Sequence, residues 1–153
     1  MPVAEQPDRS DGVMFGEIAQ GTLVGAIKFT PAVNDYHNQQ VQPGVYTLRY
    51  LLLPVDGNHQ GKAPGRDFVV LVPAALDTSS DAIAPKDLLD LSRKASSTDH
   101  AAVLSLVAPP SNPVLRALPS LVHSDQGDLW VMYFAAPFAA AAAMGIVVAG
   151  HGP

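Results

Sequence analysis

Cysteine is absent from the 153 residues of this chain. Its absence excludes disulfide bonds, thiolate metal sites and cysteine nucleophiles. Charge is also scarce, since only 15% of the residues are charged and the formal net charge is −5. No cluster of basic residues occurs, so a nucleic acid would not meet the cations that hold a phosphate backbone. We therefore expect no nucleic acid among the partners.

The familiar catalytic motifs are missing as well. The sequence has no GxSxG nucleophile elbow, no P-loop and no GxGxxG fingerprint. Asp99 and His100 follow several serines, but neighbours in sequence do not make a catalytic triad. We therefore expect no catalytic residues and favour a role that is not enzymatic.

Proline and glycine divide the chain into short segments. Fourteen prolines and twelve glycines disfavour a helical bundle, because both residues interrupt helices. Residues 1–12 are polar and contain proline, which is typical of a flexible tail. Residues 13–153 are enough for one domain with a hydrophobic core.

The segment Pro43–Pro73 carries the clearest strand signals. Its first part, Val45–Leu53, alternates in polarity, and its last part, Asp67–Val72, is a continuous apolar run after the aspartate. A β-hairpin with a long polar loop accounts for both. The residues expected to face the core are Tyr46, Leu48, Tyr50 and Leu52.

One helix is predicted at Pro85–Ala95, because proline suits a first turn and the apolar residues recur at helical spacing. The segment Leu118–Val122 has no clear pattern. Further strands are predicted at Thr22–Phe29, Val103–Val107, Leu129–Ala135 and Met144–Ala149. Short strands with turns between them, plus one short helix, indicate a mainly β fold, an antiparallel β-sandwich of immunoglobulin-like or jelly-roll-like type.

The apolar segment Leu129–Gly150 is long enough for a membrane-spanning helix. Against a helix stand Pro137 near its centre, β-branched and aromatic residues at both ends, and no basic flank. We expect two strands joined by an alanine-rich connector, and no membrane insertion.

The loop of the hairpin gathers the densest set of reactive side chains. One interpretation is a ligand-binding site at the end of the sandwich, where loops often carry function. The other is a structural loop, in which aspartate and asparagine form turns and an arginine–carboxylate pair pins the hairpin. The pattern favours the structural loop. The candidate ligand-binding residues are Asp56, Asn58, His59, Arg66 and Asp67.

A metal site is a further alternative. His59, His100 and His151 are each expected near a strand end, so they could converge on a divalent metal such as zinc. Scattered surface histidines are the simpler interpretation, and we expect no cofactor. Trp130, the single tryptophan, is either a core anchor or, with Tyr36, a platform on which a sugar stacks.

Several segments resemble a group of uncharacterised exported bacterial proteins, common in acidobacteria. The resemblance rests on Phe15–Ile18, Gly21–Gly25, PGVYTLRY, DGNHQG, Arg66–Phe68, LSRKA, HAAVLSL and IVVAGH. The PGxYTL element also resembles, more weakly, the DUF2911 group. Such proteins begin with a signal peptide and further strand-forming sequence. The N-terminal residues here have no apolar core of a signal peptide, so we expect that the domain lacks an N-terminal edge strand.

The resemblance implies a secreted or periplasmic β-rich domain and transfers no catalytic residue. With the acidic charge and the missing motifs, it leads us to expect a non-catalytic extracellular or periplasmic β-sandwich that binds a small ligand, a glycan or a protein partner. The alternative is a metal-binding protein or metal-dependent enzyme that uses loop histidines.

Overall fold

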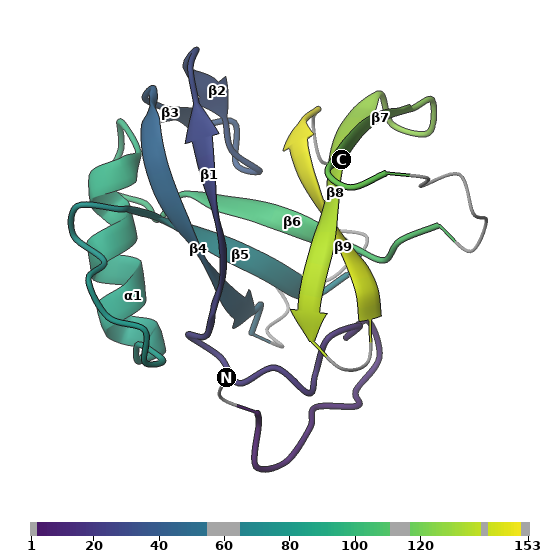
Figure 1. Cartoon of the computed structure of the whole chain (residues 1–153). Helices are drawn as coiled ribbons and strands as arrows, with labels where there is room; N and C mark the ends of the chain where they lie inside the picture. Colours follow the sequence, from purple (N-terminus) through teal and green to yellow (C-terminus); the bar gives the residue numbers. More distant parts are fainter. Residues whose placement is uncertain (1–2, 55–64, 111–116, 139–140, 151–153) are drawn as a thin grey trace.

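A computed structural model describes residues 3–54, 65–110, 117–138 and 141–150 (Figure 1). The elements are strands apart from one short helix, as the sequence predicts. In chain order they are β1 (Leu23–Phe29), β2 (Val33–Asn34), β3 (Gln40–Val41), β4 (Gly44–Leu52), β5 (Asp67–Pro73), α1 (Pro85–Ser92), a 3₁₀ turn (Arg93–Ala95), β6 (Val103–Val107), β7 (Ser120–Ser124), β8 (Leu129–Phe138) and β9 (Ala141–Ala149).

The larger sheet has the order β1-β4-β5-β6-β9-β8-β7, and all its pairs are antiparallel. It curls so that β1 and β4 face β8 and β9, as in a sandwich (Figure 1). Because β1 pairs only with β4 and β7 only with β8 in this sheet, the curl ends in a seam and does not close into a barrel. The predicted fold class, mainly β and antiparallel with one short helix, is confirmed.

The inner face of the curl holds the main core. Tyr46, Leu48 and Tyr50 of β4 point into it, and each is at most 5% exposed. Leu52, the fourth position predicted to face the core, is partly buried against the same cluster. The alternation in polarity along this strand therefore identifies its inner face correctly.

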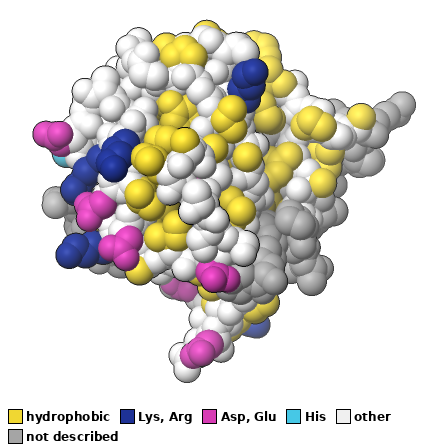
Figure 2. Space-filling model, turned by 60° about the vertical axis from the view of Figure 1, so that its left-hand side comes forward, with side chains coloured by type: hydrophobic (Ala, Val, Ile, Leu, Met, Phe, Trp, Pro, Cys, Tyr) yellow, Lys and Arg dark blue, Asp and Glu magenta, His cyan; other side chains and the backbone are white. Residues whose placement is uncertain are grey.

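The outer face of β5 is covered by α1. Leu88 of the helix is fully buried with Phe68, Val70 and Val72, which alternate with the inner-face residues of the same strand. Both faces of β5 are thus buried, which explains why its sequence is a continuous apolar run. Figure 2 shows the surface on the side of the molecule that carries α1, where hydrophobic side chains lie scattered and most charged ones lie toward one border.

The apolar segment near the C-terminus forms β8 and β9, which pair with each other. Pro137 lies within β8 where the register shifts between Ala135 and Phe138, a place that tolerates proline because the ladder is interrupted there. Among the described residues, no helix is long and apolar enough to cross a membrane. The expectation of two strands is confirmed.

The N-terminal segment folds back and bonds to itself from residue 3 onward. Val3 forms a bridge with Ile18, and the amide of Asp8 donates to the carbonyl of Gly16 at 3.1 Å. Phe15 and Ile18 are buried in the main core. We call residues 3–18 the N-terminal strap. Its first part coincides with the predicted tail, whose flexibility stays a prediction.

Candidate functional site

The predicted loop site divides between described and undescribed residues. Asp56, Asn58 and His59 lie outside the described residues, as does His151. Arg66, Asp67 and His100 are described, and their contacts can be compared with the interpretations given above.

Asp67 is a buried structural carboxylate. One oxygen, Oδ2, accepts the backbone N–H of Met14 at 2.8 Å. The other, Oδ1, accepts the N–H of Phe15 at 3.0 Å and the hydroxyl of Tyr50 at 2.8 Å. Burial, reinforced by this carboxylate, raises the pKa of Tyr50. Asp67 therefore fastens the N-terminal strap to β4 and β5, and its side chain is completely buried.

Arg66 holds the same strap at the surface. Its guanidinium donates from Nη1 to Ser10 Oγ at 2.6 Å and lies 3.8 Å from Asp8 Oδ2. Nε and Nη2 both donate to the carbonyl of Leu53, at 3.2 and 3.0 Å. These contacts match the predicted pairing of an arginine with a carboxylate at the hairpin, and they occupy the side chain that a ligand would need.

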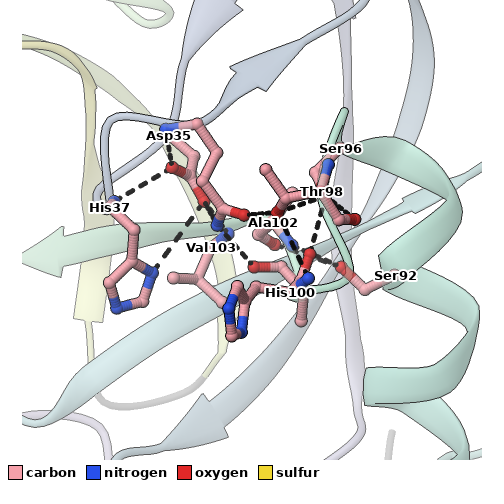
Figure 3. Close-up of polar contacts among 10 residues, drawn as sticks. Asp35, His37, Ser92, Ser96, Thr98, His100, Ala102 and Val103 are labelled. Carbon is pink, nitrogen blue, oxygen red and sulfur yellow. Dashed lines mark hydrogen bonds and ion pairs between the residues drawn. The ribbon is translucent and has the colours of Figure 1, made fainter.

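His100 lies in a polar network between the β2–β3 turn and the segment after α1 (Figure 3). At its centre is Asp35, which is 3% exposed. Its Oδ1 accepts the backbone amides of His37 and Gln39 at 2.9 and 2.8 Å. Its Oδ2 accepts Gln39 Nε2 at 2.9 Å and the amide of Val103 at 3.2 Å. The carboxylate is thus satisfied by the fold itself.

The bonds of His100 in this network run through its backbone. Ser96 Oγ donates to the His100 carbonyl at 2.7 Å, and the His100 amide donates to Thr98 Oγ1 at 3.2 Å. Thr98 in turn donates to Gln39. His37 Nδ1 lies 4.0 Å from Asp35 Oδ2, at the limit of an ion pair. Among the described residues, no three His, Asp or Glu side chains come together as metal ligands.

A buried ion pair was missed by the sequence analysis. Arg49 and Asp77 have completely buried side chains, with Arg49 Nε 2.8 Å from Asp77 Oδ2 and Nη2 2.6 Å from Oδ1. Nη1 donates to the carbonyls of Gly21 and Asp81, at 2.9 and 2.6 Å, and Nη2 also donates to that of Ser79. All five N–H donors of the guanidinium are therefore used. The bonds from Arg49 hold the pKa of Asp77 below its usual value.

An apolar cavity of about 290 Å³ lies between β1 and β8, beside the seam that the edge strands β1 and β7 leave. The sequence analysis did not predict it, although one signal was present: Gly25, a glycine inside a strand, often marks a close approach or an open space. A Cβ at Gly25 would lie 3.7 Å from Leu48 and 3.9 Å from Phe134, in ordinary contact. The cavity is lined by Gly25, Ala26, Ile27, Leu48, Leu118, Pro119, Met132, Phe134, Ala135 and Ile146.

One wall of the cavity continues onto the surface. Met132 lies opposite Leu121 in the β7–β8 pair, and Trp130 lies two residues before Met132 on the same face. Leu118, Leu121 and Trp130 are 37%, 55% and 43% exposed, and they are three of the six large hydrophobic side chains exposed among the described residues. We call these three residues the apolar shelf.

The shelf corrects the interpretation of Trp130 as a core anchor. Its indole is partly exposed and lies against His123, with ring centroids 4.9 Å apart. Tyr36, the proposed partner in a sugar platform, packs edge-on against Phe68, with the centroids 5.2 Å apart. Trp130 therefore belongs to the surface around the cavity.

Comparison of the chain with protein-family models, with curated proteins and with solved structures found no match. The cavity and the apolar shelf thus rest on the geometry alone.

Proposed function

We propose that this protein is a non-catalytic, secreted or periplasmic binding domain, and that it takes a small apolar ligand in the cavity between β1 and β8. The cavity and its lining are the observation that carries the proposal. The lining residues are all apolar or glycine, so binding there is driven by removal of apolar surface from water.

The size of the cavity limits the ligand. An engineered cavity of roughly 150 Å³ in another protein holds benzene, so about 290 Å³ is room for two fused rings or a short aliphatic chain. A glycan fits less well, because its hydroxyl groups would find no side-chain partner on this lining. The resemblance to exported bacterial proteins supports the extracellular or periplasmic location, and fractionation of producing cells tests it.

A fluorescent naphthylamine, N-phenyl-1-naphthylamine, tests the binding site. Its two fused rings match the cavity, and its phenyl ring would extend onto the apolar shelf. It is uncharged and emits strongly only in apolar surroundings. We expect one molecule to bind per chain with a Kd on the order of 10–100 μM, typical of a small ligand held by apolar contacts.

Gly25→Leu fills the cavity and should weaken probe binding at least about tenfold. Gly25→Ala should weaken it less, because its side chain fills less of the cavity. Lys28→Leu is the matched control, because it adds the same side chain to an exposed position of the same strand. Circular dichroism establishes that each variant is folded. Equal probe binding by Gly25→Leu and Lys28→Leu would refute the site.

A further inference from the structure

The way in which the cavity opens to the surface restricts the shape of its ligand. Met132 lines the cavity, and Trp130 and Leu121 extend the same face outward. An apolar molecule longer than the cavity would therefore leave it along the apolar shelf and cover these side chains. Exposed apolar surface that continues a cavity in this way is typical of a site for an elongated ligand.

The polar groups at the far end of the shelf carry negative charge. His123 lies opposite Trp130 in the β7–β8 pair, and its ring is tilted by 44° against the indole. Its Nε2 is 2.7 Å from Asp128 Oδ1, and its Nδ1 is 3.5 Å from Asp125 Oδ1. Both aspartate side chains are almost fully exposed. Two carboxylates thus accompany one imidazole beside an exposed indole.

The cationic side chain of β1, Lys28, points away from the cavity. Lys28 is exposed, whereas its neighbours Ile27 and Phe29 are buried on the inner face of the strand. Because side chains alternate along a strand, Lys28 lies on the outer face, away from the cavity. The charge near the shelf is therefore not balanced from that strand.

We propose that the ligand is an elongated amphiphile with a cationic end, such as an alkyl- or arylammonium compound. Its apolar part fills the cavity and crosses the shelf, and its ammonium group lies at Trp130, Asp125 and Asp128. An indole face attracts a cation through its quadrupole, and carboxylates add a direct charge attraction. This inference rests on the proposed function and adds to it the class of ligand.

Three ligands of equal chain length test the inference: decyltrimethylammonium, decanol and decanoate, each used below its micelle concentration. Displacement of the naphthylamine reports on the cavity, and emission of Trp130, the single tryptophan, reports on the shelf. We expect all three to displace the probe, with the cation binding about tenfold more tightly than the carboxylate at low salt. All three should change the Trp130 emission, because each chain crosses the shelf, and the cation should change it most.

The double variant Asp125→Asn, Asp128→Asn should bring the affinities for the cation and the carboxylate close to each other. Asp87→Asn, Asp90→Asn on α1 is the matched control, because it removes the same charge from exposed positions of the helix, which covers the outer face of β5. That control should keep the preference.

The outcomes separate the two proposals. Equal affinities for the three ligands, or a preference that survives Asp125→Asn, Asp128→Asn, would overturn the cationic ligand and leave the apolar site intact. Failure of all three ligands and of the probe to bind wild-type protein would overturn both.

Discussion

The loop after β5 and the seam beside β1 differ in how completely their interior is filled. At the loop, Arg49 and Asp77 are completely buried and every donor of the guanidinium is bonded. At the seam, apolar residues surround a space that no side chain of the described residues fills. The loop is thus complete as it stands, whereas the seam has room for another molecule. At the loop, polar groups stabilise the fold, whereas at the seam apolar residues leave the space in which we propose that a ligand binds.

The largest effect should come from breaking the buried ion pair. Arg49→Met leaves the Asp77 carboxylate buried without its partner, and we expect a loss of about 3–5 kcal/mol in the free energy of unfolding. Urea denaturation measures it. Arg93→Met is the control, because Arg93 pairs with Asp90 at the surface and should lose at most about 1 kcal/mol. Similar losses in the two variants would contradict the distinction.

A smaller loss should follow from weakening the bonds to the N-terminal strap. Asp67→Asn keeps the shape of the side chain but cannot accept with both ends, so one buried donor loses its acceptor. We expect a loss of about 1–3 kcal/mol. Tyr50→Phe removes a single bond to the same carboxylate and should cost about 1 kcal/mol. Denaturation curves that match wild type would show that the strap contributes little to stability.

Breaking the ion pair between Arg49 and Asp77 should also change how the stability depends on pH. The folded protein holds the pKa of Asp77 below its value of about 3.9 in the unfolded chain. Its contribution is therefore present above pH 4 and is lost as pH falls through the lower, folded pKa. Arg49→Met removes the main cause of that lowered pKa, so its stability should fall less steeply in acid than that of wild type. An equally steep fall would exclude Asp77 as a source of the acid dependence.

The smallest effect on stability should come from the apolar shelf. Leu121→Ala changes an exposed side chain, and we expect a change within about 0.5 kcal/mol. Leu48→Ala, in the core and lining the cavity, should lose about 2–5 kcal/mol. If Leu121→Ala proved as costly as Leu48→Ala, the shelf would be part of the core and not a surface free for a ligand.

The strands could be predicted because their signals are local. Alternation along β4 and the continuous apolar run of β5 identify their inner and buried faces, and Pro85 marks the first turn of α1. The burial of Arg49 could not be predicted from such local signals. Its position alternates with the core residues, so the pattern assigns it to the exposed side, but the loop at residues 77–81, which lies 28 to 32 positions further along the chain, covers it. Such burial depends on topology and leaves no local pattern.

The candidate loop site and the cavity lie in different parts of the fold, and only the loop was predicted from the sequence. The polar loop was a candidate because its reactive side chains are dense. The side chains of Arg66 and Asp67, however, form hydrogen bonds to the N-terminal strap. The cavity combines residues from β1, β4, β8 and β9 and the segment before β7. Its lining residues look like ordinary core positions in the sequence. They form a cavity because the curled sheet does not close, since its edge strands β1 and β7 do not pair with each other.

Methyl NMR spectra recorded during a titration with naphthalene show directly whether an apolar ligand enters the cavity. We expect saturable shifts for the methyl groups of Ile27, Leu48 and Ile146 around the cavity, and none for those of Val72 and Leu88 beneath the helix. Shifts confined to the methyl groups beneath α1, or no saturable shift at the cavity, would contradict the proposed site.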